Sequence, residues 1–197
     1  MQWQTKLPLI AILRGITPQE VQAHVIALLA AGFDAVEIPL NSPQWQQSIA
    51  SMVAEFGDKA LIGAGTVLKT EQVDELAAMG SKLMVTPNTQ PEVIRRAVAN
   101  GMTVCAGCAT ASEAFSALDA GAQTLKIFPS SAFGPDYIKA LKAVLPPEVA
   151  GICCRRRYAG KPAYLAAGRL CRSRTGQRFI PRRAAGEPHQ RKGKSIC

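Results

Sequence analysis

Short apolar runs and stretches with helical spacing alternate six times along the chain, and this alternation limits the possible folds more than any other feature. The expected strands are residues 7–13, 33–40, 60–63, 83–86, 102–105 and 124–128. The expected helices are residues 18–31, 43–56, 70–79, 91–100, 111–120 and 135–144. Strands that alternate regularly with helices form a parallel sheet, because each helix carries the chain back across the sheet. We therefore expect an α/β fold.

Six strand–helix units fit either an open doubly wound sheet or an incomplete (β/α)₈ barrel. The Gly-x-Gly-x-x-Gly fingerprint that would favour an open sheet does not follow the first strand. Polar or reactive residues instead follow or end the strands, namely Arg14, Glu37, Thr66, Pro87, Asn88, Cys108 and Lys126. In a barrel these strand ends meet at one mouth, where catalytic groups gather. We therefore prefer the (β/α)₈ TIM barrel.

The composition and charge divide the chain into two regions. The 197 residues are 48% hydrophobic, which fits one globular domain, and no apolar run is long enough to span a membrane. Residues 1–150 carry 10 Lys and Arg against 13 Asp and Glu, whereas residues 151–197 carry 13 basic residues and a single acid. Their net charges are therefore −3 and +12. We expect a cytoplasmic protein without a secretory signal or a membrane partner.

Cys105 and Cys108 form a C-x-x-C motif, whose spacing fits a redox pair, half of a zinc site or two structural thiols. The sequence has only two histidines, and no second close cysteine pair lies at zinc-finger distance. We therefore expect structural thiols in and after a strand.

Lys126 lies in an apolar strand that should be buried on both faces. Loss of hydration disfavours the charged ammonium, which leaves neutral amine for attack on a carbonyl carbon. Glu37 lies in a second apolar strand, where burial should raise its pKa and suit it to both accept and donate a proton. The alternative is that Lys126 and Glu37 form a structural ion pair.

Four polar residues are candidates for substrate binding, each with a structural alternative. Arg14 ends the first strand and Thr66 follows two glycines, so they could bind a carboxylate or phosphate; they could also cap a helix and form a turn. Ser130 precedes a helix and could bind phosphate or serve as a helix cap. Asn41 could contact the substrate or begin a turn.

Five short motifs occur in an order and spacing that resemble the 2-keto-3-deoxy-6-phosphogluconate/phosphogalactonate aldolase family. They are A-I-L-R-G at 11–15, V-E-I-P-L-N-S at 36–42, I-G-A-G-T-V at 62–67, V-T-P-N at 85–88 and L-K-I-F-P at 125–129. The resemblance implies a class I aldolase barrel that needs no metal or organic cofactor, a homotrimer, and a small phosphorylated sugar acid as its partner. It also implies Lys126 as the Schiff-base lysine and Glu37 as the general acid and base. Arg14 and Thr66 would contact the acidic end of the substrate, and Pro87 would line the pocket.

The phosphogluconate branch of this family commonly has arginine four residues after the catalytic glutamate. This chain has Asn41 there and Arg14 on the first strand, a combination that resembles the phosphogalactonate branch. The resemblance therefore implies cleavage of 2-dehydro-3-deoxy-6-phospho-D-galactonate to pyruvate and D-glyceraldehyde 3-phosphate, in galactonate breakdown. The phosphogluconate epimer and 4-hydroxy-2-oxoglutarate are the alternative substrates.

Residues 151–197 do not continue the pattern of the first 150. The family should continue with a strand ending in a Gly-Gly turn and a unit with a G-L-G-S turn. Codons chosen for residues 151–162 and read one nucleotide later encode A-S-A-V-G-G-V-T-P-E-N-L. The same shift over residues 169–182 yields G-C-A-G-A-G-L-G-S-D-L-Y-R. We therefore interpret 1–150 as barrel units one to six and 151–197 as the frameshifted remainder.

This interpretation leaves the last two barrel units missing or scrambled, so we expect unpaired edges at the first and sixth strands. The alternative interpretation is a basic tail that binds nucleic acid. The tail is poor in aromatic residues and its arginines follow no helical stripe, so we expect no nucleic-acid partner.

Overall fold

The computed structural model describes residue 5, residues 9–154 and residues 164–168. Its strands are β1 (Leu9–Ile12), β2 (Ala35–Pro39), β3 (Leu61–Gly65), β4 (Leu83–Val85), β5 (Thr103–Cys108), β6 (Thr124–Ile127), β7 (Ala150–Cys154) and β8 (Tyr164–Gly168). Its helices are α1 (Pro18–Ala30), α2 (Trp45–Phe56), α3 (Thr70–Ala78), α4 (Pro91–Ala99), α5 (Ala111–Asp119) and α6 (Ser130–Val144). The prediction of six strand–helix units is confirmed.

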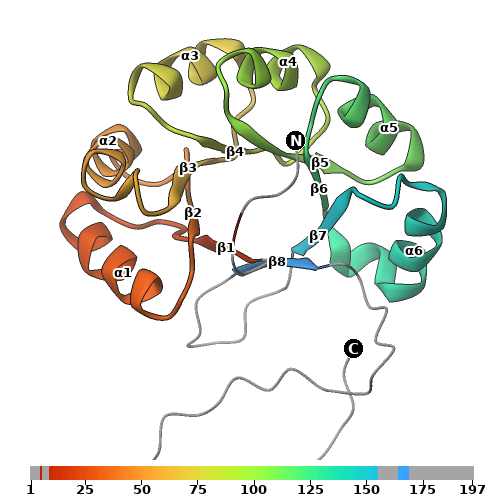
Figure 1. Cartoon of the computed structure of the whole chain (residues 1–197), viewed down its shortest axis with the longest axis horizontal. Coiled ribbons are helices and arrows are strands. Elements are labelled where there is room, and N and C mark those ends of the chain that lie inside the picture. The colour runs from red at the N-terminus through yellow and green to blue at the C-terminus, as the bar shows by residue number, and fades with distance from the viewer. Residues whose placement is uncertain (1–4, 6–8, 155–163, 169–197) are drawn as a thin grey trace, which may run out of the picture.

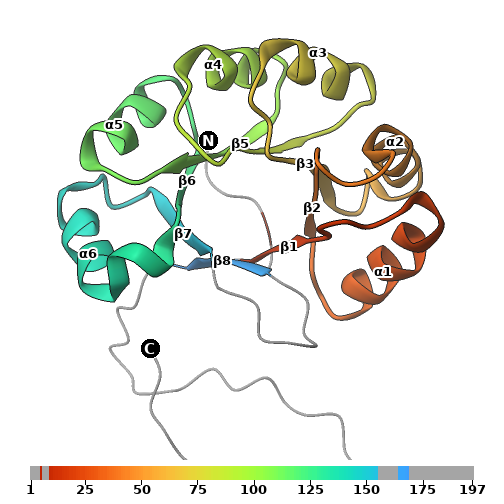
Figure 2. The same ribbon diagram turned by 180° about the vertical axis from the view of Figure 1, so that it is seen from behind.

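The six helices lie in an arc outside the ring of strands (Figure 1), and the view from behind shows the same arrangement (Figure 2). Strands β1 to β7 pair in sequence order, and each is parallel to the next. Strand β8 closes the ring but runs antiparallel to both β7 and β1. The described residues therefore confirm a parallel α/β arrangement of six units, followed by a seventh parallel strand and an antiparallel eighth strand.

The expectation of unpaired edges at β1 and β6 is wrong, because β8 pairs with β1 and β7 pairs with β6. The reversed direction of β8 has a simple geometric reason. Only residues 155–163 separate β7 from β8, and a crossover between parallel strands needs about a dozen residues or more. The interpretation of residues 151–197 as a frameshifted remainder concerns residues that, apart from 151–154 and 164–168, lie outside the described part of the chain.

Alternation along the strands separates two layers of apolar side chains. The layer inside the ring comprises Ile10, Ile12, Ala35, Leu83, Val85 and Cys105. The larger layer lies between the strands and the helices and includes Leu125 and Ile127 of β6. Because successive side chains of a strand point to opposite faces, Glu37 and Lys126 share the inner face with Ala35.

Local sequence signals define the helix ends. At α5, the amide of Thr110 donates to Glu113 Oε2 over 2.8 Å, and the amide of Glu113 donates to Thr110 Oγ1 over 3.2 Å. These reciprocal bonds satisfy donors that a helix start leaves unpaired. Helix α6 begins at Ser130, five residues before the predicted start, and Gly134 breaks it with φ 72°. The expected helix therefore corresponds to the part of α6 after this kink.

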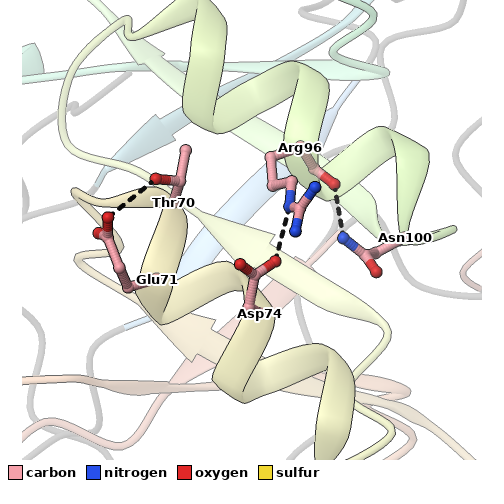
Figure 3. Close-up of polar contacts among 5 residues, drawn as sticks. All are labelled: Thr70, Glu71, Asp74, Arg96 and Asn100. Atoms are coloured by element: carbon pink, nitrogen blue, oxygen red, sulfur yellow. Dashed lines mark hydrogen bonds and ion pairs between the residues drawn. The ribbon is translucent and has the colours of Figure 1, made fainter.

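An exposed ion pair joins two neighbouring helices. Arg96 Nε of α4 lies 2.6 Å from Asp74 Oδ1 of α3, and the Asn100 side chain donates to the Arg96 carbonyl over 2.9 Å (Figure 3). The hydrogen bond from Arg96 lowers the pKa of Asp74. Both side chains are about half exposed, so water screens the attraction.

The C-x-x-C motif lies within β5, and its two cysteines belong to different layers. Cys105 packs inside the ring and Cys108 packs between strands and helices, and neither forms a disulfide. Burial raises the pKa of the Cys108 thiol to about 12. This geometry favours structural thiols over a redox pair or half of a zinc site.

None of the helices in the described part of the chain is long and apolar enough to cross a membrane.

Candidate active site

Glu37 and Lys126 enter the interior of the ring from nearly opposite places in the strand order. Glu37 is the central residue of β2 and is 2% exposed, while Lys126 is the third residue of β6 and is 7% exposed. Their inward direction follows from strand alternation and not from an unusual backbone. The prediction that both side chains are buried within apolar strands is therefore confirmed.

The Glu37 carboxyl is enclosed and poorly paired. Burial raises its pKa above the ordinary value of 4.5, while the positive charges of Lys126 and Arg14 act in the opposite direction. Its Oε2 atom has no hydrogen-bond partner among the described residues. A carboxyl with these properties is suited to exchange protons with a ligand.

The alternative of a structural ion pair between Glu37 and Lys126 is not supported. Within the described ranges no ion pair joins them, although Lys126 is near enough to influence the Glu37 carboxyl electrostatically. Lys126 Nζ instead lies 5.3 Å from the centre of the Phe128 ring. The Lys126 amine thus lies close to the Phe128 ring. It interacts electrostatically with the Glu37 carboxyl without forming an ion pair with it.

Backbone space beside Lys126 is supplied by a glycine on the neighbouring strand. Gly107 of β5 stands opposite Lys126 in the register, and a Cβ atom added there would overlap the backbone of Pro87. Glycine thus allows the turn after β4 to lie over β5. Pro87 is half-buried and lies beyond the carboxyl end of β4, the end of the strands at which the sequence predicts the pocket.

Two threonines that the sequence analysis did not single out hold this turn in place. Thr86 Oγ1 donates to the Asn88 carbonyl over 2.7 Å and accepts from the Gly107 amide over 2.9 Å. Thr89 Oγ1 donates to the Gly107 carbonyl over 2.7 Å. Together they attach the turn that contains Pro87 to β5.

Arg14 and Asn41 lie on exposed turns after β1 and β2. The amide of Gly15, which has φ 73°, donates to the buried Ser42 Oγ over 3.0 Å and so joins these two turns. Ser42 was also missed by the sequence analysis. The positive charge of Arg14 acts to lower the pKa of Glu37, so the guanidinium is near enough to influence the carboxyl electrostatically.

Thr66 directly follows β3 and adopts φ 61°, a left-handed conformation that is uncommon for a β-branched residue. Such strain is retained where the surrounding structure requires it, often at binding sites. Ser130 is half-buried at the start of α6. Ser130 and Asn41 follow β6 and β2, and the expectation that they bind substrate rests on this position at the strand ends.

A surface cavity of about 600 Å³ lies elsewhere, between the N-terminal ends of α3 and α4. Its lining includes none of the residues predicted to bind substrate or to react. The ring interior is the stronger candidate site, because in the part of the chain that the structure describes only this region holds both a buried amine and a buried carboxyl. Among the described residues, no three His, Cys, Asp or Glu side chains gather as they would around a metal ion.

Comparison with known proteins identifies close relatives. A model of the KDPG and KHG aldolase family matches residues 2–152. The chain is 77% identical over 150 residues to 2-dehydro-3-deoxy-6-phosphogalactonate aldolase of Escherichia coli strain K12, which covers 76% of this chain and 73% of the relative. A solved structure described as native KDPGal is also 77% identical, with a TM-score of 0.75 over 77% of this chain and 73% of that one.

Two further solved structures bear on chemistry and assembly. A KDPG aldolase of Legionella pneumophila, with pyruvate captured as a covalent carbinolamine intermediate, is 25% identical with a TM-score of 0.67. The match covers 76% of this chain and 75% of the Legionella pneumophila chain. A designed protein cage made by fusing symmetric oligomeric domains is 76% identical with a TM-score of 0.73, over 75% of this chain and 54% of that one.

Proposed function

The chain belongs to the KDPG and KHG aldolase family, and we propose that its Lys126 carries out the family's carbon–carbon bond cleavage through a Schiff base. The enzyme is a lyase that cleaves 2-dehydro-3-deoxy-6-phosphogalactonate, as the relative with 77% identity does by name. The proposed mechanism rests on one observation: the buried amine of Lys126 on β6 forms no ion pair with the buried carboxyl of Glu37 on β2, within the described ranges.

In the proposed reaction, the neutral Lys126 amine attacks the C2 ketone of the substrate. The carbinolamine loses water and becomes an iminium, which withdraws electrons from the C3–C4 bond. Loss of the C4 hydroxyl proton breaks this bond and releases D-glyceraldehyde 3-phosphate. The remaining enamine is protonated at C3, and water then releases pyruvate and the free amine. The carbinolamine captured with pyruvate in the Legionella pneumophila relative supports this sequence of steps.

We assign the proton transfers to Glu37. Its carboxyl is buried with the amine inside the ring, and burial raises its pKa toward the range in which a carboxyl can both take and return a proton. It would accept the C4 hydroxyl proton and help to move protons as the carbinolamine forms. Its unpaired Oε2 atom is available for this contact.

The remaining predicted residues would bind the substrate. Arg14 and Thr66 would contact its acidic end, since a guanidinium and a hydroxyl both donate hydrogen bonds to carboxylate or phosphate oxygens. Pro87 would form a wall of the pocket, held by the turn that Thr86 attaches to β5. Asn41 and Ser130 are proposed as further contacts.

The Schiff base can be tested directly by trapping. Incubation with pyruvate and borohydride should add one reduced pyruvate to Lys126, which peptide mass mapping would locate. Lys139 and Lys142 of α6 provide internal controls, because they lie outside the ring. A label on either of them, or no label at all, would contradict the proposed role of Lys126.

Substrate preference, assembly and location complete the proposal. The phosphogalactonate and phosphogluconate differ at one stereocentre, so measuring cleavage of both C4 epimers decides between the preferred and the alternative substrate.

We also propose that the protein forms a homotrimer. The relative that is part of a cage built from symmetric oligomeric domains supports this assembly, and sedimentation would test it. A cytoplasmic location agrees with two buried thiols that form no disulfide within the described ranges.

We further propose that residues 151–197 arise from a shift of reading frame. The family match ends at residue 152, close to the point where the charge and spacing of the sequence change. The relative from Escherichia coli is covered over 73% of its length, so about a quarter of it has no counterpart in the alignment. Resequencing the gene around the codon for residue 150 would test this interpretation.

A further inference from the structure

Gly65, the last residue of β3, lies directly against the Glu37 carboxyl. Gly65 stands opposite Pro39 in the register and Glu37 stands opposite Gly63, so the carboxyl reaches along the ring toward the end of β3. A Cβ atom added at Gly65 would overlap Oε2 of Glu37 and lie 2.6 Å from its Cδ. The space beside Gly65 is therefore occupied by a side chain from the neighbouring strand.

Space, and not backbone conformation, requires glycine at this position. Gly65 is a strand residue without the positive φ that marks Gly15 and several other glycines of the chain. The inward glycines Gly63 and Gly107 differ from it, because a Cβ atom at either would meet backbone atoms. At Gly65 all three of the nearest obstructing atoms belong to one titratable side chain.

The Glu37 carboxyl has few other constraints on its position. It is 2% exposed, and its Oε2 atom accepts no hydrogen bond from the described residues. A methyl group at position 65 would therefore turn the carboxyl to another rotamer and change its distance from Lys126. We propose that Gly65 is a positioning residue, whose missing side chain provides the space that directs the Glu37 carboxyl toward Lys126. This inference rests on the proposed function of Glu37.

The first experiment changes the size of both partners in the full chain. Gly65→Ala should lower kcat by roughly 10- to 10³-fold, up to the usual worth of a general base, with a smaller change in KM and a shifted pH profile. Glu37→Asp alone should also lower kcat. Glu37→Asp combined with Gly65→Ala should be more active than Gly65→Ala alone, because aspartate is one methylene shorter and leaves room for the methyl group.

Melting temperatures provide a second readout that does not depend on activity. Gly65→Ala should lower Tm in the wild-type background but much less in a Glu37→Ala background, where the obstructing carboxyl is gone. Glu37→Gln is the matched control: because glutamine has the same size as glutamate, Gly65→Ala should lower Tm as much in this background as in the wild type. This comparison remains informative even if Gly65→Ala alone is too unstable to assay.

The inference is overturned if Gly65→Ala keeps the wild-type kcat and pH profile. It is also overturned if the losses in Tm simply add in the Gly65→Ala/Glu37→Ala double variant, because then the methyl group meets something other than Glu37. Failure of the proposed function would look different. In that case the unmodified chain would neither cleave the substrate nor take up pyruvate on Lys126.

Discussion

Residues 1–150 and residues 151–197 contribute to the same ring of strands but carry very different information. The first region has net charge −3, regular strand–helix alternation and the whole predicted site, and it contains nearly all of the family match. The second has net charge +12, no such alternation and no Gly-Gly step. Its described part consists of β8 and most of β7, and β8 is antiparallel to its neighbours.

The difference shows that closing a ring is less demanding than completing a site. Strand pairing uses backbone N–H and C=O groups, which nearly every residue has, so the open edges of β1 and β6 can accept strands of unrelated sequence. A phosphate-binding turn instead needs glycines at fixed positions, so that several amides can point at one anion. The second region satisfies the first requirement without the residues for the second.

Restoring the shifted frame after residue 150 should have the largest effect. The restored chain should exceed the chain as written in turnover of the phosphogalactonate by roughly 10³-fold or more, because several charge-assisted hydrogen bonds to phosphate are each worth about 1.5–3 kcal/mol. It should also melt at a higher temperature. After residue 150, the chain as written lacks the strand–helix alternation that would supply helices to cover the last part of the ring.

Both forms should be assayed with the phosphorylated substrate and by thermal melting in the same buffer. Pyruvate labelling of Lys126 serves as the control, since pyruvate has no phosphate and does not need the missing turns. Equal turnover and equal Tm would show that residues 151–197 form a working end to the barrel.

Glu37→Gln tests the site of the first region and should have the next largest effect. Turnover should fall by roughly 10²–10⁴-fold, because glutamine cannot accept the C4 hydroxyl proton. Labelling of Lys126 by pyruvate and borohydride should still reach completion, though more slowly. A near-normal turnover would reduce Glu37 to a structural role.

The same variant should be more stable than the wild type, and its advantage should grow with pH. Burial raises the pKa of Glu37 in the folded protein above the ordinary value of 4.5. Its contribution to stability is therefore fully present below pH 4.5 and is lost as the pH rises through the folded pKa. Glutamine does not titrate, so the difference in Tm between variant and wild type should increase from acidic to neutral pH.

Much of the fold and site followed from the sequence because their signals are local. Apolar runs located the six strands, and Lys126 and Glu37 were identifiable as charged residues inside such runs. The direction of β8 was not predictable in this way, because pairing depends on which edges are free and on the length of the connection. The contact of Ser42 that joins two turns and the contact of Thr86 that attaches a turn to β5 could not be predicted either, since each links residues far apart in the chain.

Thr66→Gly should show a moderate effect with opposite signs for stability and binding. Glycine adopts the left-handed conformation of Thr66 without strain, which should stabilise the fold by about 1 kcal/mol. Loss of the hydroxyl should raise KM by roughly 10-fold if it donates to the substrate, the equivalent of about one hydrogen bond. Thr66→Ser, which keeps the hydroxyl, is the control for binding. Unchanged KM in Thr66→Gly would restrict Thr66 to forming a turn.

Arg96→Ala should have the smallest effect, although it removes the most visible ion pair of the first region (Figure 3). Arg96 and Asp74 are both about half exposed, so solvent screens their attraction and Tm should change by no more than about 2 °C. Turnover should not change, because the pair lies outside the ring.

The pH dependence identifies the source of whatever change in Tm is measured. The hydrogen bond from Arg96 holds the pKa of Asp74 below its ordinary value of 3.8, so the pair contributes above that pH and its contribution is lost as the pH falls through the folded pKa. The difference between Arg96→Ala and the wild type should therefore disappear in acid, and it should also shrink at high salt. A large loss of Tm that persists in acid would mean that the contacts between α3 and α4 hold this region together. The stability of residues 1–150 would then depend on the helix surface as well as on the paired strands and the two apolar layers around them.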